Sequence, residues 1–278
     1  MIESQKNKSI LITGATDGLG KALAIKLASD GAKLLLHGRN TQKGIDLVRE
    51  IIEVTGNHDI HYYNANFASL SEVNRLSEEI SKKHTHLDLL INNAAIGGGP
   101  LKAGTRELSV EGYELRFAVN YLSHFSLTMN LLPLLKQSTA GRIVMVSSIG
   151  QAAIDFNDLM MESSYDSYTA YCRSKLAQII FGNRLAERVK DDNVIVNSVH
   201  PATLMPTNMV FDYFGKTAAS IDDGVNSVLY VGCSTETAHI TGSYFNQTKI
   251  AKANMQAYDT GAQIQLWKIS EDLISVPQ

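Results

Sequence analysis

The sequence predicts an α/β fold: a single domain with one doubly wound parallel sheet of about seven strands and helices on both faces. Three observations lead to this prediction. Short apolar runs alternate with helical patterns along almost the whole chain. The first apolar run ends in a glycine-rich turn that leads directly into a helix. Polar residues suited to chemistry follow several other runs, and ligands of such sheets bind beyond the carboxyl ends of the strands.

A strand is expected over residues 9–12, and residues 13–20 form the glycine-rich turn. Strand, turn and helix in this order aim free backbone N–H groups and the positive end of the helix at a phosphate. Gly14 permits a tight turn, Gly18 a close approach to a pyrophosphate, and Gly20 close packing of the helix on the strand. Glycine turns also join strands to helices for purely structural reasons. The spacing G-x-x-x-G-x-G also differs from the G-x-G-x-x-G of many dinucleotide sites.

The second strand, expected over residues 33–37, ends before Gly38-Arg39-Asn40. A dinucleotide fold selects its cofactor at this point. A carboxylate would bind the ribose 2′-hydroxyl of NAD, whereas an arginine accommodates the 2′-phosphate of NADP. No acidic residue lies in this stretch. Arg39 therefore predicts NADP(H), and a solvated loop arginine is the structural alternative.

The remaining elements continue the alternation. Further strands are expected over residues 60–63, 87–91, 142–146, 194–199 and 243–245. Helices are expected over residues 41–55, from the N-cap Ser69 to 83, from Ser109 or Glu111 to about 131, and over 167–190, 222–233 and 264–274. Residues 96–102 contain three consecutive glycines and are expected to form a flexible loop. Residues 1–8 form a polar tail, 9–246 the main domain, and 247–278 a C-terminal helical extension of that domain.

Tyr171 and Lys175 lie four residues apart in the helix expected over residues 167–190, so both side chains project from one face. A free tyrosine has a pKa of about 10, and a nearby cation lowers this value. The pair could therefore act as acid and base near pH 7. For an isolated match, a chance spacing on an amphipathic helix is the alternative.

Asn120 lies inside an apolar run, and a buried asparagine must satisfy its amide. Capping of backbone groups and a functional role are both open for this residue.

The chain as a whole excludes several classes of protein. Its 278 residues, 44% hydrophobic and 19% charged, suit a soluble globular protein with a deep core. The formal net charge of −3 gives no reason to expect nucleic acid or an anionic membrane as a partner. Cys172, Cys233 and the eight histidines show no ligand spacing, so no metal is assigned. Without a signal peptide or an apolar run of about 18 residues, the chain is expected to be cytoplasmic.

These motifs, taken together and in order, resemble the short-chain dehydrogenase/reductase family. The matching segments are residues 13–20, Asn92-Asn93-Ala94, Asn120, Ser147-Ser148 and residues 171–175. The resemblance covers about residues 8 to 250 and implies a Rossmann-type fold. Residues 154–159 and 266–271 look closer to the retinol dehydrogenase-like branch. Mammalian retinol enzymes commonly carry a membrane anchor, which is not evident here.

The resemblance implies a role for each catalytic residue. Tyr171 would be the acid in carbonyl reduction and the base in alcohol oxidation. Lys175 would lower the pKa of Tyr171 and hold the nicotinamide ribose. Ser148 would hydrogen-bond the substrate oxygen, and Asn120 would support a water that links Lys175 to solvent. The implied cofactor-binding residues are Gly14, Thr16, Asp17, Gly18, Leu19, Gly20, Arg39, Asn66, Phe67, Asn93, Ala94, Ala95, Tyr171, Lys175, Pro201 and Thr203.

Some positions depart from the family pattern. Asn66 stands where an aspartate commonly contacts the adenine, and Ala95 and Ala202 replace glycines. Pro206 falls where a threonine is expected, so either Thr203 or Thr207 could meet the nicotinamide carboxamide.

The expected function is NADP(H)-dependent transfer of hydride between the nicotinamide and a carbonyl, or a primary or secondary alcohol, of a largely apolar small molecule. Residues 149–166 and 201–220 would be the substrate loops, and apolar side chains on them suit such a ligand. These candidates are Ile154, Phe156, Leu204, Met205, Met209, Phe211 and Phe214. The same side chains could instead close the core beneath the loops.

Two other functions are alternatives to an oxidoreductase. A non-catalytic NADP(H)-binding sensor or partner module on the same fold would not need Tyr171 as an acid. A methyltransferase on a similar sheet would need neither Tyr171 and Lys175 nor Arg39. Family members are often dimers or tetramers, so a homodimer or homotetramer is compatible with the sequence, although residues after 246 could cover part of the usual contact surface.

Overall fold

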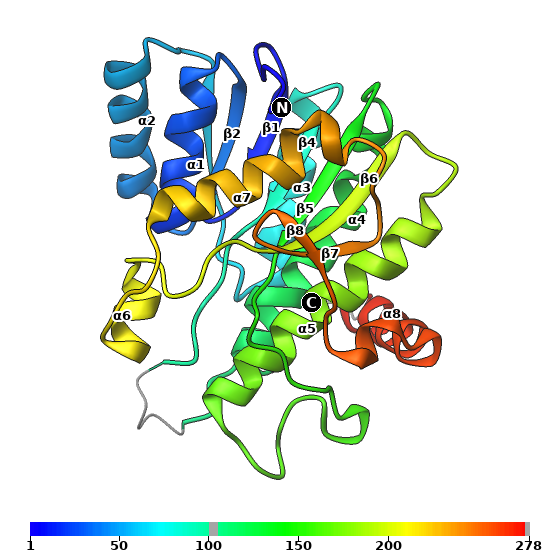
Figure 1. The fold of residues 1–278 in the computed structure, drawn as a ribbon. Coiled ribbons are helices and arrows are strands. Elements are labelled where there is room, and N and C mark those ends of the chain that lie inside the picture. Colours follow the sequence, from blue (N-terminus) through cyan, green and yellow to red (C-terminus); the bar gives the residue numbers. More distant parts are fainter. Residues whose placement is uncertain (100–104, 276–278) are drawn as a thin grey trace.

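The computed structural model describes residues 1–99 and 105–275, with the side chains of residues 212–214 outside the description. Within these residues one 8-stranded sheet runs in the order β3-β2-β1-β4-β5-β6-β7-β8 (Figure 1). The strands are β1 (Ser9–Ile12), β2 (Lys33–Gly38), β3 (Ile60–Asn64), β4 (Leu89–Asn92), β5 (Gly141–Val146), β6 (Val194–His200), β7 (Ser243–Asn246) and β8 (Lys249–Ala251). Strands β1 to β7 are parallel to their neighbours, and β8 pairs antiparallel with β7.

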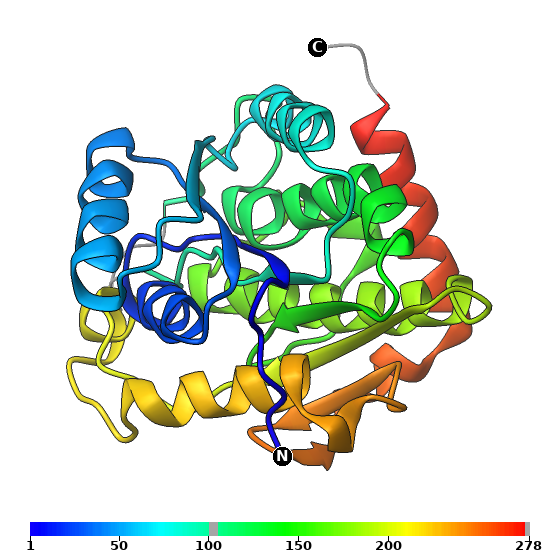
Figure 2. The same cartoon turned by 90° about the horizontal axis from the view of Figure 1, so that it is seen from above.

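Helices cover both faces of the sheet (Figure 2). They are α1 (Gly18–Ser29), α2 (Thr41–Thr55), α3 (Leu70–Lys83), α4 (Ser123–Lys136), α5 (Ser167–Arg188), α6 (Asn208–Phe214), α7 (Ile221–Cys233) and α8 (Thr260–Ile274). One core lies between the sheet and α1, α2 and α7, and the other between the sheet and α3, α4 and α5. The doubly wound α/β prediction is therefore confirmed.

Local signals explain where several helices begin and end. The Asn40 side chain accepts a hydrogen bond from the Lys43 N–H and caps α2, which ends at Gly56 in the left-handed conformation. Asp166 caps α5 in the same way through the Thr169 N–H. Such caps satisfy the free N–H groups of a first turn, which fixes the start of the helix that carries Tyr171.

The expected count of about seven strands was one short, and the sheet is mixed rather than wholly parallel. The missed strand β8 is only three residues long and has no apolar run that would predict it. The polar N-terminal tail also docks onto the fold, because the Glu3 N–H donates to the Cys233 carbonyl oxygen at 2.9 Å. In the C-terminal extension, Leu266 and Trp267 of α8 enter the core beside α5.

The helix expected to start at Ser109 or Glu111 begins later. Residues around Gly112, whose φ is +85°, form a tight turn closed by an isolated bridge between Leu108 and Glu114. A π-helix then spans Phe117–Leu122 and continues into α4. The substrate loop expected over residues 201–220 contains the short helix α6 (Figure 1). The glycine loop expected over residues 96–102 lies partly outside the described residues. In the part of the chain that the structure describes, no helix combines the length and hydropathy needed to cross a bilayer.

Candidate active site

The glycine turn between β1 and α1 leaves no room for a side chain at its glycine positions. Gly14 and Gly18 have φ values of +66° and +48°, which favour glycine. A Cβ on Gly14 would lie 2.8 Å from the Ala94 Cα, and one on Gly20 would lie 2.7 Å from the Asn93 amide nitrogen and overlap the Gly14 carbonyl oxygen. The turn therefore presents bare backbone at the N-terminus of α1, as a cradle for a pyrophosphate requires.

The ends of β1 and β4 are locked together at this turn. The Thr13 hydroxyl oxygen accepts hydrogen bonds from the backbone N–H groups of Asn93 and Ala94 at 2.8 and 2.9 Å. The Asn93 amide donates in return to the Thr13 carbonyl oxygen at 2.8 Å. Asn93 and Ala94 thus stand next to the glycine turn, as the family resemblance implies.

Two buried histidines support the turn, and neither was identified from the sequence. His37 lies between the Gly14 N–H, 3.3 Å from Nδ1, and the Ala65 carbonyl oxygen, 3.0 Å from Nε2. Burial lowers the pKa of His37 to about 4, so the ring is neutral and can accept at Nδ1 while it donates at Nε2. His124 similarly joins the Asn120 carbonyl oxygen at 2.9 Å to the Thr13 hydroxyl at 3.0 Å. The only sequence signal was a histidine inside an apolar run.

Arg39 follows β2 at the same edge of the sheet. The residue is exposed, and its guanidinium makes no hydrogen bond or ion pair with any residue that the structure describes. A Cβ on the neighbouring Gly38 would lie 2.8 Å from the Thr16 methyl group, so Thr16 lies against the residue that precedes Arg39. An unengaged guanidinium suits a phosphate group.

Two of the predicted cofactor-binding residues, Asn66 and Phe67, lie in different environments. Asn66 is exposed, and its Oδ1 accepts a hydrogen bond from the Ala68 N–H at 3.1 Å. The ring of Phe67 is buried and stacked on His37 with a centroid distance of 4.1 Å. The side chain of Phe67 therefore belongs to the core, and only its backbone could face a cofactor.

Lys175 is buried on α5 with its amine held by two oxygens. Its Nζ donates to the Val146 carbonyl oxygen at 2.9 Å and to the Gln178 Oε1 at 3.0 Å. Because an ammonium has three N–H donors, one is left for a further acceptor such as a ribose hydroxyl. Burial lowers the pKa of Lys175 to about 7. Gln178, which was not identified from the sequence, is thus a direct partner of Lys175.

Tyr171 and Ser148 stand together at the carboxyl end of β5. The Ser148 hydroxyl oxygen accepts a hydrogen bond from the Gly150 N–H at 3.0 Å, which leaves its own hydrogen free to donate. Burial raises the pKa of the Tyr171 phenol, while the Ser148 hydroxyl acts in the opposite direction. Lys175 is not among the groups that shift the pKa of Tyr171 in the chain alone, so its expected effect on this pKa stays a prediction. Its amine lies 5.9 Å from the ring centroid and is itself only partly charged near pH 7.

Asn120 lies in the π-helix, a conformation that often marks functional sites. Its amide group accepts from the Ile96 N–H at 2.8 Å and donates to the Ile96 carbonyl oxygen at 3.0 Å and the Ser174 hydroxyl at 2.9 Å. Both amide hydrogens are used in this clamp between the loop after β4 and α5. Asn120 therefore has no free amide hydrogen to donate to the expected water.

The segment after β6 reaches back to the glycine turn. The Thr207 methyl group lies 2.9 Å from where a Cβ on Gly18 would be, and the Asn208 amide donates to the Asp17 Oδ2 at 2.7 Å. Thr203 is exposed, and its hydroxyl is 3.1 Å from the His200 Nε2. Thr207 therefore lies over the phosphate end of the turn, while Thr203 lies two residues after Pro201.

The apolar residues expected to contact substrate fall into different environments. Ile154 is buried in the core, and Met205 packs against Gly224 of α7. Met209 contacts Gly97, and Phe211 is 52% exposed. Phe156 is partly buried and packs against the core. Leu204 is half-buried, and the side chain of Phe214 lies outside the described residues.

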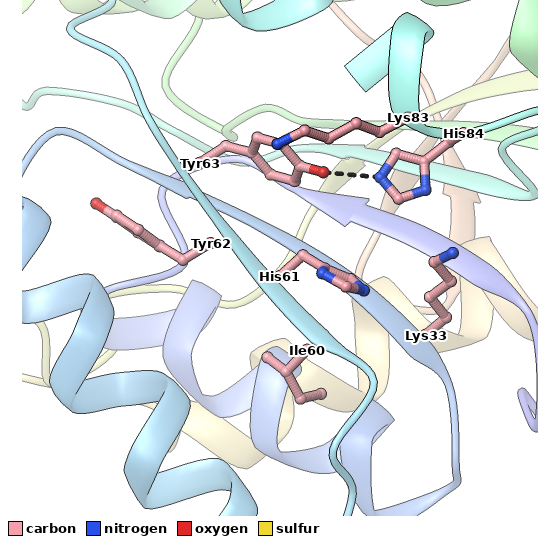
Figure 3. Close-up of a pocket in the computed structure, with 7 residues that line it drawn as sticks. All are labelled: Lys33, Ile60, His61, Tyr62, Tyr63, Lys83 and His84. Carbon is pink, nitrogen blue, oxygen red and sulfur yellow. Dashed lines mark hydrogen bonds between the residues drawn. The ribbon is translucent and has the colours of Figure 1, made fainter. Parts of the chain in front are cut away.

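A cavity of about 380 Å³ lies away from all these groups (Figure 3). Its lining includes Lys33 and Ile60, the first residues of β2 and β3. The Tyr63 hydroxyl and the His84 Nε2 are 2.7 Å apart at its edge. The cavity is therefore at the amino ends of the strands, opposite to the glycine turn and Tyr171, and is not part of the candidate active site.

The buried amine of Lys175 should give the protein without added cofactor a characteristic pH dependence. Since the pKa is about 7 in the folded state and 10.5 ordinarily, the unfolded chain binds more protons between these values, and stability should rise with pH from about 7 to 10.5. In Lys175→Met this rise should be smaller by about 2 to 4 kcal/mol. Urea unfolding of both proteins at pH 7 and pH 10 measures the difference. Exposed Lys82→Met is the control, and equal pH dependence in wild type and Lys175→Met would contradict the prediction.

Comparison with known proteins agrees with this geometry. A family model described as short chain dehydrogenase matches residues 8–216. Retinol dehydrogenase 11 of Mus musculus is 33% identical over 280 residues, which are 97% of this chain and 87% of the relative. An uncharacterized protein from Mycobacterium paratuberculosis has a TM-score of 0.81 and 29% identity, with 98% and 95% of the two chains covered. A short chain dehydrogenase from Escherichia coli CFT073, solved in complex with NADPH, has a TM-score of 0.72 and 26% identity, with 88% and 99% covered.

Proposed function

The chain belongs to the short-chain dehydrogenase/reductase family, in its retinol dehydrogenase-like branch, and we propose that it uses NADP(H) to interconvert a carbonyl and an alcohol on a largely apolar small molecule. The observation that carries the proposal is the meeting of Tyr171, Ser148 and buried Lys175 beyond the carboxyl end of β5. The acid and the amine lie on α5, and the hydrogen-bond donor follows β5, two strands along the sheet from β1 and the glycine turn.

The residues present fit a nicotinamide dinucleotide. The glycine turn offers backbone N–H groups for the pyrophosphate, and Lys175 has one N–H left for the ribose. Thr16 and the unengaged Arg39 would hold the 2′-phosphate of NADP. When bound, the cofactor supplies or accepts the hydride.

The protein's own residues would handle the substrate oxygen. In the reductive direction the Ser148 hydroxyl donates a hydrogen bond to the carbonyl oxygen and stabilises the charge that develops there. Tyr171 then transfers its phenolic proton to this oxygen, which becomes the alcohol hydroxyl. Burial raises the pKa of Tyr171, so the phenol keeps its proton near neutral pH and has one to transfer to the developing alkoxide.

A non-catalytic NADP(H)-binding sensor on the same fold is the second candidate. It would need the glycine turn and Arg39 but not a phenol beside a free hydroxyl hydrogen. The Tyr171 and Ser148 arrangement therefore favours the enzyme. Purified protein that binds NADPH but oxidises none of it with any carbonyl would favour the sensor.

The substrate class is tested with a panel of carbonyl compounds. Met209 and Phe211 lie on α6, whose first residues contact Asp17 of the glycine turn and Gly97, and such side chains favour apolar ligands. We expect NADPH oxidation with aromatic and long-chain aldehydes or ketones, with kcat/KM at least about tenfold above that for small charged keto acids. The decrease in NADPH absorbance with time measures each rate. Activity confined to small charged keto acids would contradict this substrate class.

A further inference from the structure

A polar network of two buried charged residues and one half-buried tyrosine holds the loop after β4 and has no role in the chemistry described above. It consists of Glu114, Arg116 and Tyr165, here termed the Glu114–Arg116–Tyr165 network. The Arg116 Nη1 donates to the Tyr165 hydroxyl at 2.8 Å, and this hydroxyl donates to the Glu114 Oε1 at 2.9 Å. The Glu114 Oε2 accepts from the Phe117 N–H at 2.7 Å, at the start of the π-helix.

The charges of this network are balanced and largely removed from water. Arg116 and Glu114 are buried and lie 3.6 Å apart, and the exposed carboxylate of Glu107 lies 3.7 Å from the same guanidinium. A buried pair of this kind is rigid because each group has few alternative partners. Its geometry can therefore fix the position of whatever the guanidinium binds.

The guanidinium holds the loop that follows β4. Its Nε donates to the Gly97 carbonyl oxygen at 3.1 Å. The preceding residue, Ile96, is the one clamped through both its N–H and its carbonyl by Asn120. Two buried side chains thus grip consecutive residues of this loop, Asn120 towards α5 and Arg116 towards Tyr165.

Gly97 in turn packs against α6. A Cβ on Gly97 would lie 2.7 Å from the Met209 Cγ, in the first turn of α6. The same end of α6 is tied to the glycine turn through Asn208 and Asp17. The position of Gly97 therefore affects where α6, with the apolar side chains of Met209 and Phe211, lies relative to the glycine turn.

We propose that the Glu114–Arg116–Tyr165 network determines substrate specificity by positioning Gly97 against Met209, and so sets the size of the substrate site. Arg116 and Tyr165 are positioning residues: they act through Gly97 and contact no reacting atom. This inference rests on the proposed function. It predicts that loosening the network changes the KM for bulky substrates and leaves the hydride-transfer groups intact.

Tyr165→Phe is the first test, because it removes one hydroxyl from the network and keeps the ring. For the largest apolar carbonyl substrate of wild type, KM should change by about threefold to tenfold, the scale of one hydrogen bond to charged groups. Both kcat and the Kd for NADPH should stay within about twofold. Tyr113→Phe is the matched control, because its hydroxyl donates to the Leu273 carbonyl oxygen on the far side of the same turn.

A double-mutant cycle tests the contact between Gly97 and Met209 directly. Gly97→Ala should shift the KM for bulky substrates, because the added methyl group must displace Met209. Met209→Ala provides room for that methyl group, so the double variant should recover most of the loss, and the two effects should not add. Additive effects would overturn the proposed path through this contact.

Different results would contradict the proposed function and the positioning role of the network. A wild-type protein without carbonyl reductase or alcohol dehydrogenase activity would end the proposed function. An active wild type with the same KM in Tyr165→Phe across small and bulky substrates would overturn the positioning role alone. If Tyr165→Phe does not fold, the cycle on Gly97 and Met209 still decides the question, since neither residue belongs to the buried ion pair.

Discussion

Replacing Tyr171 with phenylalanine should lower kcat by about 10²- to 10⁴-fold, the usual contribution of a positioned acid. The substitution keeps the ring and its packing on α5 and removes only the ionisable oxygen. In the structure this oxygen is the group whose pKa is raised by burial and is influenced by the Ser148 hydroxyl. The affinity for NADPH should change little, because the phenol is distant from the groups that would bind the phosphates and adenine.

Steady-state kinetics and fluorescence titration with NADPH measure both quantities. Tyr168→Phe is a matched control, since its ring stacks on Tyr171 with a centroid distance of 6.2 Å but lies one turn earlier on α5. Ser148→Ala should lower turnover alone, whereas Lys175→Ala should weaken both turnover and cofactor binding. A Tyr171→Phe enzyme with near wild-type turnover would end the proposed mechanism, whatever the behaviour of the other variants.

The sequence predicted most of the fold because the buried strands are continuous apolar runs bounded by turn residues. Expected boundaries of β2 and β5 differ by one residue from those observed. The strand β8 was missed because pairing with β7, rather than its own residues, makes it a strand. The π-helix starts late because of the turn at Gly112. The sequence does not distinguish a glycine in the left-handed conformation from a glycine in any other conformation.

The candidate site was predictable as far as it depends on strand ends. The glycine turn, Asn93, Ser148 and Tyr171 all follow from motifs placed on a parallel sheet. The supporting residues His37, His124 and Gln178 could not be identified, because their roles arise from contacts between elements far apart in the chain. The lowered pKa of Lys175 could not be predicted for the same reason: desolvation depends on burial, which one pair of residues on a helix does not reveal.

Replacing Arg39 with aspartate should weaken NADPH binding by about 2 to 3 kcal/mol, or about 30- to 150-fold in Kd. The wild-type Arg39 is exposed, and its guanidinium has no partner among the described residues, so it can bind the 2′-phosphate without breaking another contact. Aspartate removes this charge-assisted hydrogen bond and places a negative charge where the phosphate would lie. Since NADH lacks that phosphate, its affinity should stay the same or increase.

The matched control for Arg39→Asp is Arg49→Asp, which makes the same change of charge on the exposed face of α2, where Arg49 lies 3.6 Å from Asp46. Charges on the exposed surface are screened by salt over about 10 Å at 0.1 M, so this control should leave both affinities within about twofold of wild type. Titration of both proteins with NADPH and NADH therefore separates a local phosphate contact from a general effect of charge. Equal affinity of the wild-type protein for NADH and NADPH would show that Arg39 does not select the cofactor, and the preference would then have to be set elsewhere in the site.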